Sequence, residues 1–174
     1  MNPDAAMALD GMRGAGKTTV GRMIAARLGC GFVDTDDEVE RRMGRSIRDA
    51  FAAGEAGEFR RVEAEVVREV LARPDVVVAT GGGSVEDAAT RDALARVCTV
   101  WLVAPPETLV ARCGGVNRPP LTDLGPIREA GSVLARRAPM YAACASLLVD
   151  SGGRSPEEVA AGILDYLAAR KKKG

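Results

Sequence analysis

The sequence predicts an α/β fold in which a parallel β-sheet is covered by helices on both faces. Short apolar runs alternate along the chain with segments of helical periodicity, which is the pattern of successive βαβ units. Two of these runs, at 75–79 and 97–103, are rich in branched apolar residues, as is typical of strands buried on both sides of a parallel sheet. Because the 174 residues contain neither a repeat nor a linker, we expect a single domain over 1–174.

The elements of the N-terminal half are predicted from local patterns. Val20, Ile24 and Leu28 recur at four-residue steps and predict an amphipathic helix that ends at Gly29. Ser46 is a suitable N-cap for a later short helix. The predicted strands are 5–9 and 31–34, and the predicted helices are 17–28, 36–44, 46–53 and 58–72.

The C-terminal half continues the same alternation. Trp101 lies inside an apolar run, so we expect it to be a core residue and not a platform for a ligand. We expect Pro139 to break a helix and Pro156 to begin one. The Gly/Pro-rich segment at about 112–125 is long enough to form a moving lid. The predicted strands are 75–79, 97–103 and 147–150, and the predicted helices are 88–95, 106–112, 127–143 and 156–170.

The composition is that of a soluble globular protein, with 47% hydrophobic and 28% charged residues. The net charge of zero gives no sign of a strongly basic surface for nucleic acid. No apolar stretch approaches the roughly 20 residues that a membrane span needs, and no secretory leader is visible. The four cysteines are scattered and histidine is absent, which excludes the usual zinc sites. We therefore expect a cytoplasmic protein that binds neither nucleic acid nor a membrane.

Residues 11–18 read GMRGAGKT, which fits the pattern GxxxxGK[ST] between a predicted strand and a predicted helix. The backbone amides of such a loop turn toward phosphate oxygens, and the helix N-terminus adds its dipole. Lys17 would neutralise the β- and γ-phosphates, and Thr18 could ligate Mg²⁺. Lys17 is the only lysine outside the run 171–173 in a chain that otherwise uses arginine. The loop therefore predicts an enzyme that uses Mg-ATP.

Two aspartates at the end of the second predicted strand indicate an acceptor site beside the phosphate loop. The carboxyl ends of neighbouring parallel strands share one crevice. Asp34 and Asp36 are two residues apart, so in an extended segment both would face that crevice. One could help to hold Mg²⁺ through water while the other accepts a proton from an attacking hydroxyl. The alternative is that Asp36 only caps the next helix.

Cationic residues and a glycine run supply the rest of the predicted site. Arg60 beside Phe59 suits a ring-shaped carboxylate, and Glu63 could fix the rotamer of Arg60, although a solvated charged face is the usual interpretation of such a run. Three successive glycines at 81–83 sacrifice stability, which favours close approach of the backbone to a ligand. Arg112 and Arg118 flank a flexible turn and could carry positive charge onto the γ-phosphate.

Taken together, these motifs resemble the shikimate kinase family from about residue 9 to residue 164. The resemblance implies a nucleoside-monophosphate-kinase-like P-loop fold with a central five-stranded parallel sheet, a substrate-binding region at about 34–61 and a lid. It also implies transfer of the ATP γ-phosphate to the 3-hydroxyl of shikimate, on the chorismate route to aromatic amino acids. The motifs that carry it are 11–19 (GMRGAGKTT), 34–36 (DTD), 59–60 (FR), 81–83 (GGG), 118–119 (RP) and 137–141 (RAPMY).

The resemblance also implies a role for each matching residue. Asp36 would contact the substrate hydroxyls and act as or near the catalytic base, while Arg60 and Arg137 would bind the carboxylate. Arg118 would reach the phosphates from the lid, and Arg112 would lie along the adenine. The expected residues are Gly14, Ala15, Gly16, Lys17, Thr18, Thr19, Arg112 and Arg118 for ATP; Asp36, Phe51, Phe59, Arg60, Glu63, Gly81, Gly82, Gly83 and Arg137 for shikimate; Lys17, Asp36 and Arg118 for catalysis; and Thr18 and Asp34 for Mg²⁺.

The chain departs from the family pattern at two positions. The predicted lid has Arg118-Pro119-Pro120-Leu121 where the family has RPLL, and the second proline stiffens it. Asp10 stands where an apolar residue is expected. A carboxylate there would oppose ATP unless it points away from the phosphates or is paired.

Two other functions are compatible with the phosphate loop. One is a different small-molecule kinase of the same fold, acting on gluconate or a nucleoside monophosphate, although such an enzyme would not need both the glycine run and the Phe-Arg pair. The other is a degenerate ATP-binding regulatory domain, which would have no physical need for the full set of Lys17, Thr18, Asp36, Arg60 and Arg137. We expect ATP and shikimate as the small-molecule partners and a monomeric protein.

Overall fold

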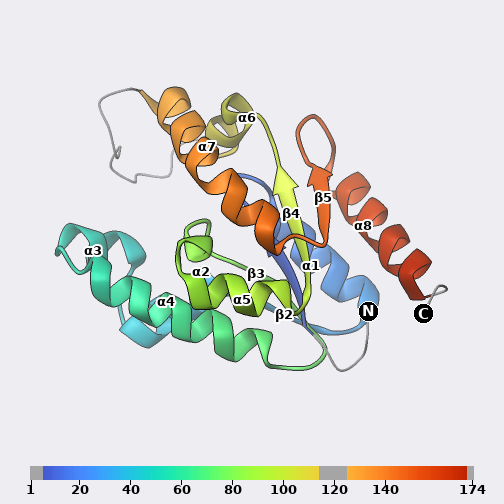
Figure 1. Cartoon of the computed structure of the whole chain (residues 1–174), viewed down its shortest axis with the longest axis horizontal. Helices are drawn as coiled ribbons and strands as arrows, with labels where there is room; N and C mark the ends of the chain where they lie inside the picture. The colour runs from blue at the N-terminus through green and yellow to red at the C-terminus, as the bar shows by residue number, and fades with distance from the viewer. Residues whose placement is uncertain (1–5, 114–124, 172–174) are drawn as a thin grey trace.

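The computed structural model of the protein describes residues 6–113 and 125–171. Within these residues, five parallel strands form one sheet in the order β2-β3-β1-β4-β5 (Figure 1). The predicted α/β class with a central five-stranded parallel sheet is therefore confirmed. The strands are β1 (Met7–Asp10), β2 (Gly31–Asp34), β3 (Val76–Ala79), β4 (Cys98–Val103) and β5 (Leu147–Asp150).

Helices cover the sheet on both faces, as predicted. α1 and α8 pack against each other on one face, and α4, α5 and α7 form the layer on the other (Figure 1). α2 packs on α4, and α6 packs on α7. The elements are α1 (Lys17–Leu28), α2 (Thr35–Met43), α3 (Ile47–Ala52), α4 (Ala56–Leu71), the 3₁₀ helix η1 (Ser84–Glu86), α5 (Ala88–Ala95), α6 (Pro106–Arg112), α7 (Pro126–Cys144) and α8 (Pro156–Lys171).

The central strands form the middle of the hydrophobic core. All four residues of β1 and all four of β3 are buried, as the branched apolar run at 75–79 predicted. Trp101 on β4 is also buried and stacks on Tyr141 of α7, with the ring centroids 5.5 Å apart. The prediction that Trp101 belongs to the core is confirmed.

Local capping explains where several helices begin and end. α1 ends at Gly29, which has a left-handed conformation and donates its backbone N–H to the carbonyl of Ala25. Ser46 caps α3 as predicted, because its hydroxyl accepts from the amide of Asp49 at 3.0 Å. α4 begins at Ala56, two residues before the predicted start.

The predicted break at Pro139 is wrong, because α7 runs without interruption from Pro126 to Cys144. Proline removes one hydrogen bond from the interior of a helix. Packing compensates here, because Tyr141 and Cys144 are buried beyond the proline, and Val133 packs on the core before it. Pro156 begins α8 as predicted.

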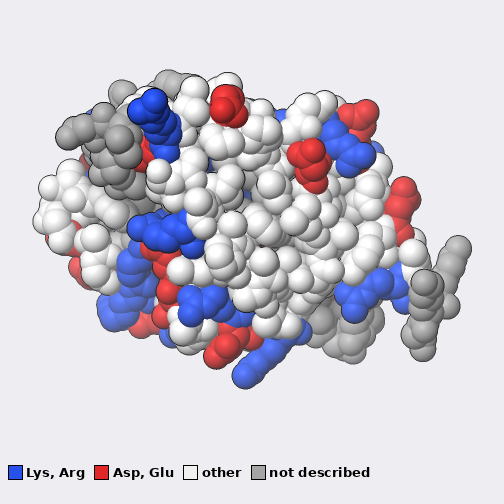
Figure 2. Space-filling model, turned by 45° about the horizontal axis from the view of Figure 1, so that its top comes forward, with Lys and Arg blue, Asp and Glu red and all other residues white. Residues whose placement is uncertain are grey.

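The surface carries charges of both signs. In the view of Figure 2, basic and acidic side chains are intermixed near one end, and a broad area without charged residues lies beside them. Many of the charged residues pair with each other, as in the bridge from Arg42 on α2 to Glu69 on α4 at 2.5 Å. Among the described residues, no helix combines the length and the apolar character that a membrane crossing requires.

Candidate active site

A glycine-rich loop connects β1 to α1 at the carboxyl edge of the sheet. Gly14 has a φ of 82°, a conformation that side chains rarely adopt. A Cβ at this position would collide with the carbonyl oxygen of Leu109 and approach Cys113 Sγ to 3.0 Å. The loop therefore needs glycine both for its conformation and for its packing against α6.

Lys17 curls back over this loop. Its Nζ donates to the carbonyls of Gly11 at 2.8 Å and Met12 at 3.0 Å. Burial lowers the pKa of Lys17, and the nearby carboxylates of Asp10, Asp36 and Asp34 oppose that shift. The ammonium group is thus held at the concave side of the loop, where it can pair with a phosphate group.

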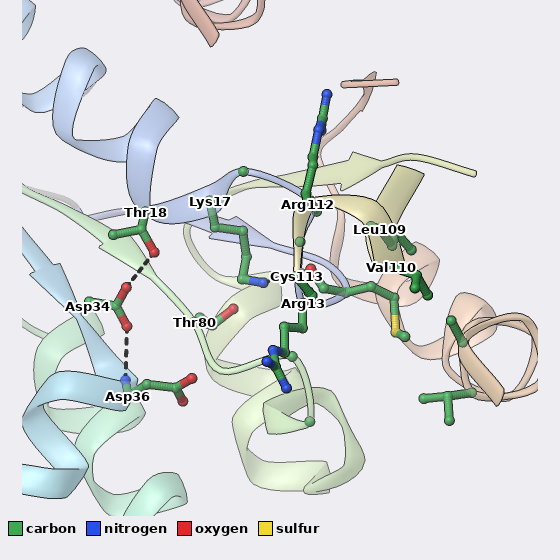
Figure 3. A pocket seen from close by; sticks show the side chains of 18 of the residues that line it. Arg13, Lys17, Thr18, Asp34, Asp36, Thr80, Leu109, Val110, Arg112 and Cys113 are labelled. Atoms are coloured by element: carbon green, nitrogen blue, oxygen red, sulfur yellow. Dashed lines mark hydrogen bonds between the residues drawn. The ribbon is translucent and has the colours of Figure 1, made fainter. Parts of the chain in front are cut away.

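Thr18, Asp34 and Asp36 form a chain of hydrogen bonds beside the loop (Figure 3). Thr18 Oγ1 donates to Asp34 Oδ2 at 2.6 Å, and Asp34 Oδ1 accepts from the backbone N of Asp36 at 3.0 Å. The helix predicted at 36–44 is confirmed as α2 (Thr35–Met43), so Asp36 neither extends the strand nor caps the helix. Asp34 is the N-cap of α2, and Asp36 lies in its first turn. Both aspartates nevertheless line the same cavity.

The oxygens of Thr18 and Asp34 fit a magnesium ion that is bound mainly through phosphates. Mg²⁺ prefers oxygen ligands and usually takes only one or two from the protein in nucleotide sites. In the part of the chain that the structure describes, no cluster of three or more His, Cys, Asp and Glu side chains is placed to hold a metal by itself. A metal at this position would therefore depend on the nucleotide as well as on these two residues.

Arg60 lies on α4 among aromatic rings and a buried carboxylate. Its Nη1 donates to Glu63 Oε2 at 2.5 Å, which is the contact that their spacing on the helix suggests. The guanidinium group lies 5.1 Å from the ring centroid of Phe59 and 6.0 Å from that of Phe51. Glu63 is buried, and Ser84 donates to its other oxygen at 3.0 Å.

The glycine run at 81–83 is packed closely against other parts of the site. A Cβ on Gly81 would lie 2.5 Å from Glu63 Oε1 and 2.7 Å from Asp36 Oδ1, and a Cβ on Gly83 would collide with the guanidinium group of Arg60. Gly81 and Gly83 thus make room for side chains of the site, and a Cβ on Gly82 would approach the backbone of the phosphate loop, at 3.2 Å from Arg13 N and 3.3 Å from the carbonyl oxygen of Gly11. Gly82 and Gly83 line the cavity, whereas Gly81 does not.

Glu86 is a residue of this site that the sequence interpretation missed. Its Oε1 accepts from Arg137 Nε at 2.9 Å and from Arg136 Nη2 at 2.7 Å. Burial alone would raise the pKa of Glu86, but the hydrogen bond from Arg137 and the charges of Arg137, Arg136 and Arg60 outweigh it and lower the pKa. An acidic residue three positions after the glycine run was the available signal.

One oxygen of the Asp10 carboxyl is hydrogen-bonded, and the other, Oδ2, is buried without a hydrogen-bond partner among the described residues. Asp10 is buried, and its Oδ1 accepts from the backbone N of Gly11 at 2.7 Å and from Thr80 Oγ1 at 2.8 Å. Burial raises the pKa of Asp10 to about 6, although Thr80, Gly11 and Lys17 pull it downward. The carboxylate ties the start of the phosphate loop to the end of β3.

One cavity of about 870 Å³ connects the phosphate loop with the residues expected for the acceptor. Arg112 contributes to its wall while donating to the carbonyl of Ser151 at 2.7 Å. Arg118 lies outside the described residues, as does most of the predicted lid. Sequence reasoning did not single out Arg13, Arg48 or Arg154, which also line the cavity. Its predicted lining residues are Gly14, Ala15, Gly16, Lys17, Thr18, Thr19, Asp34, Asp36, Phe51, Phe59, Arg60, Glu63, Gly82, Gly83, Arg112 and Arg137.

Comparisons with known proteins agree on one family. The sequence model of the family described as shikimate kinase matches residues 13–168. A shikimate kinase of Symbiobacterium thermophilum is 44% identical over 95% of this chain and 98% of its own length. One of Mycobacterium tuberculosis is 43% identical over 91% of both chains.

Solved structures point to the same family. The shikimate kinase of Acinetobacter baumannii in complex with shikimate superposes with a TM-score of 0.90 at 34% identity, covering 96% of this chain and 94% of that one. A gluconokinase of Sinorhizobium meliloti has a TM-score of 0.61 at 18% identity, covering 99% of this chain and 97% of that one, so it shares the fold alone. The resemblance that the ordered motifs indicated is confirmed, and the chain belongs to the shikimate kinase family.

Proposed function

We propose that this protein transfers the γ-phosphate of ATP to the 3-hydroxyl of shikimate, giving shikimate 3-phosphate and ADP. The observation that carries the proposal is the single cavity that joins the phosphate loop to Asp36, Arg60 and Arg137. Relatives more than 40% identical over most of their length bear the name shikimate kinase. Phosphoryl transfer depends mainly on positioning and charge stabilisation, and this cavity offers both.

The loop side of the cavity is assigned to Mg-ATP. Backbone amides of 14–18 and the N-terminus of α1 would surround the phosphates, and Lys17 would turn from the Gly11 and Met12 carbonyls toward them. Thr18 and Asp34 would hold Mg²⁺, which neutralises charge on the β- and γ-phosphates when bound. Arg112 is assigned to the adenine side, where it already lines the cavity.

The opposite side is assigned to shikimate. Asp36 would accept the hydrogen bond of the attacking hydroxyl and take up its proton during transfer. Arg60 and Arg137 would receive the carboxylate, because a guanidinium group matches its geometry. Phe51 and Phe59, whose ring centroids are 5.1 Å apart, would form an apolar wall against the ring.

The proposal also covers the predicted lid and the oligomeric state. Arg118 is assigned to the phosphates, and the segment at about 112–125 to closure over them. We also propose that the protein is a monomer of one domain, as the sequence led us to expect.

The test is a coupled assay of ADP release with shikimate, gluconate and CMP as acceptors. We expect activity with shikimate alone, and activity only with gluconate or CMP would refute the assignment. The Lys17→Ala and Asp36→Asn variants should lower kcat/KM about a hundred- to thousandfold. Asp37→Asn is the matched control, because Asp37 neighbours Asp36 on α2 but does not line the cavity.

The same assay distinguishes the proposed kinase from a regulatory domain that only binds ATP. Such a domain would bind Mg-ATP and release no ADP with any of the three acceptors. The packing of Asp36, Glu63 and Arg60 against the glycine run favours the enzyme, because mere nucleotide binding does not require these groups.

A further inference from the structure

Glu86 lies where three elements meet at the acceptor end of the cavity. It is the last residue of η1 and follows the glycine run, and its backbone N donates to the carbonyl of Gly83 at 3.0 Å. Both α4, which carries Arg60, and α7, which carries Arg137, pack against η1. The side chain of Glu86 can therefore reach cationic groups on two helices.

The carboxylate of Glu86 contacts three arginines. Oε1 accepts from Arg137 Nε at 2.9 Å and from Arg136 Nη2 at 2.7 Å, and Oε2 is 3.9 Å from Arg60 Nη2. The side chain of Arg137 is only 12% exposed, whereas that of Arg136 is 61% exposed. Arg137 is therefore the partner whose orientation Glu86 restricts more strongly.

Glu86 contacts these arginines without entering the cavity. Arg60 and Arg137 both line it, and Glu86 does not. The position of Glu86 leaves the space in front of Arg137 open to a ligand. A long arginine side chain loses much rotamer freedom when it binds, so an arginine that is already fixed binds at a lower entropic cost.

The ion pairs of Arg60, Arg136 and Arg137 suit a ligand with a single carboxylate. Arg60 already pairs with Glu63 at 2.5 Å, and Arg136 and Arg137 share Glu86. Within these ion pairs, three guanidinium groups meet two carboxylates, which leaves one positive charge. One acceptor carboxylate would neutralise it.

We infer that Glu86 is a positioning residue, which holds Arg137 through its Nε so that the guanidinium group faces the carboxylate of the acceptor. The inference rests on the proposed function and adds to it a determinant of acceptor affinity. Glu86 does not contact the phosphate loop, so its contribution belongs to the KM for shikimate and not to kcat or to the KM for ATP.

The experiment compares Glu86→Ala and Glu86→Gln with the wild type, using shikimate and its uncharged methyl ester. Glu86→Ala removes the acceptor of Arg137 Nε, and we expect the KM for shikimate to rise about three- to tenfold. Glu86→Gln keeps an oxygen that can accept from Nε, so its KM should stay within about twofold of the wild type. The binding of the ester, measured as a substrate or as a competitor of shikimate, should not change in either variant, because it has no carboxylate for Arg137.

Glu65→Gln is the matched control, since Glu65 pairs with Arg61 on the exposed side of α4 and does not line the cavity. Three results would overturn the inference: an unchanged KM in Glu86→Ala, an equal loss with the ester, or a loss in Glu86→Gln as large as that in Glu86→Ala. These results presuppose a wild type that phosphorylates shikimate. A wild type that neither binds nor phosphorylates shikimate would instead overturn the proposed function, and the inference with it.

Discussion

The hydroxyl of Thr18 donates to Asp34 Oδ2 at 2.6 Å, and this bond links the first turn of α1 to the end of β2. The other oxygen of Asp34 caps α2 through the amide of Asp36. One carboxylate thus positions the hydroxyl assigned to Mg²⁺ and the helix that carries the aspartate assigned to the acceptor. The metal side and the acceptor side of the site are mechanically connected through Asp34.

This arrangement predicts that Asp34→Asn weakens the use of magnesium. An asparagine can still cap α2, but it removes the negative charge that supports the metal beside Thr18. We expect the Mg²⁺ concentration for half-maximal activity to rise about tenfold, as measured by titrating Mg²⁺ at saturating ATP. Asp87→Asn is the matched control, because Asp87 caps α5 in the same way, accepting from Thr90 N at 2.7 Å, and does not line the cavity. An unchanged magnesium requirement would remove Asp34 from the metal site.

The glycine run gives a prediction about acceptor binding. In Gly83→Ala, the new Cβ would collide with the guanidinium group of Arg60. A flexible side chain can move away, so the fold should survive while Arg60 leaves its position. We expect the KM for shikimate to rise about tenfold or more, with the KM for ATP nearly unchanged.

Gly57→Ala is the control for this variant, because Gly57 lies on the same helix as Arg60 and a Cβ there meets nothing within 4 Å. Steady-state kinetics with each substrate varied in turn distinguishes the two variants. A Gly83→Ala enzyme with a normal KM for shikimate would show that Arg60 does not need its present position.

Local patterns predicted much of the fold and the nucleotide side of the site. The phosphate loop is contiguous in sequence, and its glycines, Lys17 and Thr18 are dictated by backbone geometry and charge. The inner strands β1, β3 and β4 were found because the parallel sheet buries both of their faces, so continuous apolar runs mark them, whereas the edge strands β2 and β5 are only partly buried. These features need no knowledge of which segments meet in space.

The features that were missed or wrong depend on tertiary contacts. Glu86 meets Arg136 and Arg137 only because η1 packs on α7, and their separation in sequence hides this. Pro139 stays inside α7 because the packing of the helix on the core, through Val133 before the proline and the buried Tyr141 and Cys144 after it, outweighs the loss of one hydrogen bond.

Asp10 predicts a specific pH dependence of stability. Burial raises the pKa of Asp10 from 3.8 to about 6 in the folded protein, so the folded state holds the proton more tightly than the unfolded state. The resulting stabilisation is complete below about pH 4 and is lost as the pH rises through 6. Asp10→Asn removes this dependence, so between pH 4 and 7 the free energy of unfolding of the variant should rise by about 2 to 3 kcal/mol relative to the wild type.

Urea denaturation at several pH values measures this difference. Asp165→Asn on the exposed surface of α8 serves as the control and should follow the wild type at every pH. A difference between Asp10→Asn and the wild type that does not vary with pH would contradict the prediction. The same variant also removes a negative charge near Lys17, so its KM for ATP should fall and not rise.

The side chain of Tyr141 links the hydrophobic core to the glycine run at 81–83. Its hydroxyl donates to the carbonyl of Gly82 at 2.6 Å while its ring stacks on Trp101. Tyr141→Phe keeps the stacking and leaves the Gly82 carbonyl without this donor. We expect a loss of about 1 kcal/mol in the free energy of unfolding and a higher KM for shikimate, because the loop that borders Arg60 loses an anchor.

Tyr166→Phe is the control, since its hydroxyl bonds to the carbonyl of Ser146 at 3.2 Å at an exposed position. This variant should change neither the free energy of unfolding nor the KM for shikimate. If Tyr141→Phe loses stability but keeps its KM for shikimate, the hydrogen bond serves the fold and not the acceptor site.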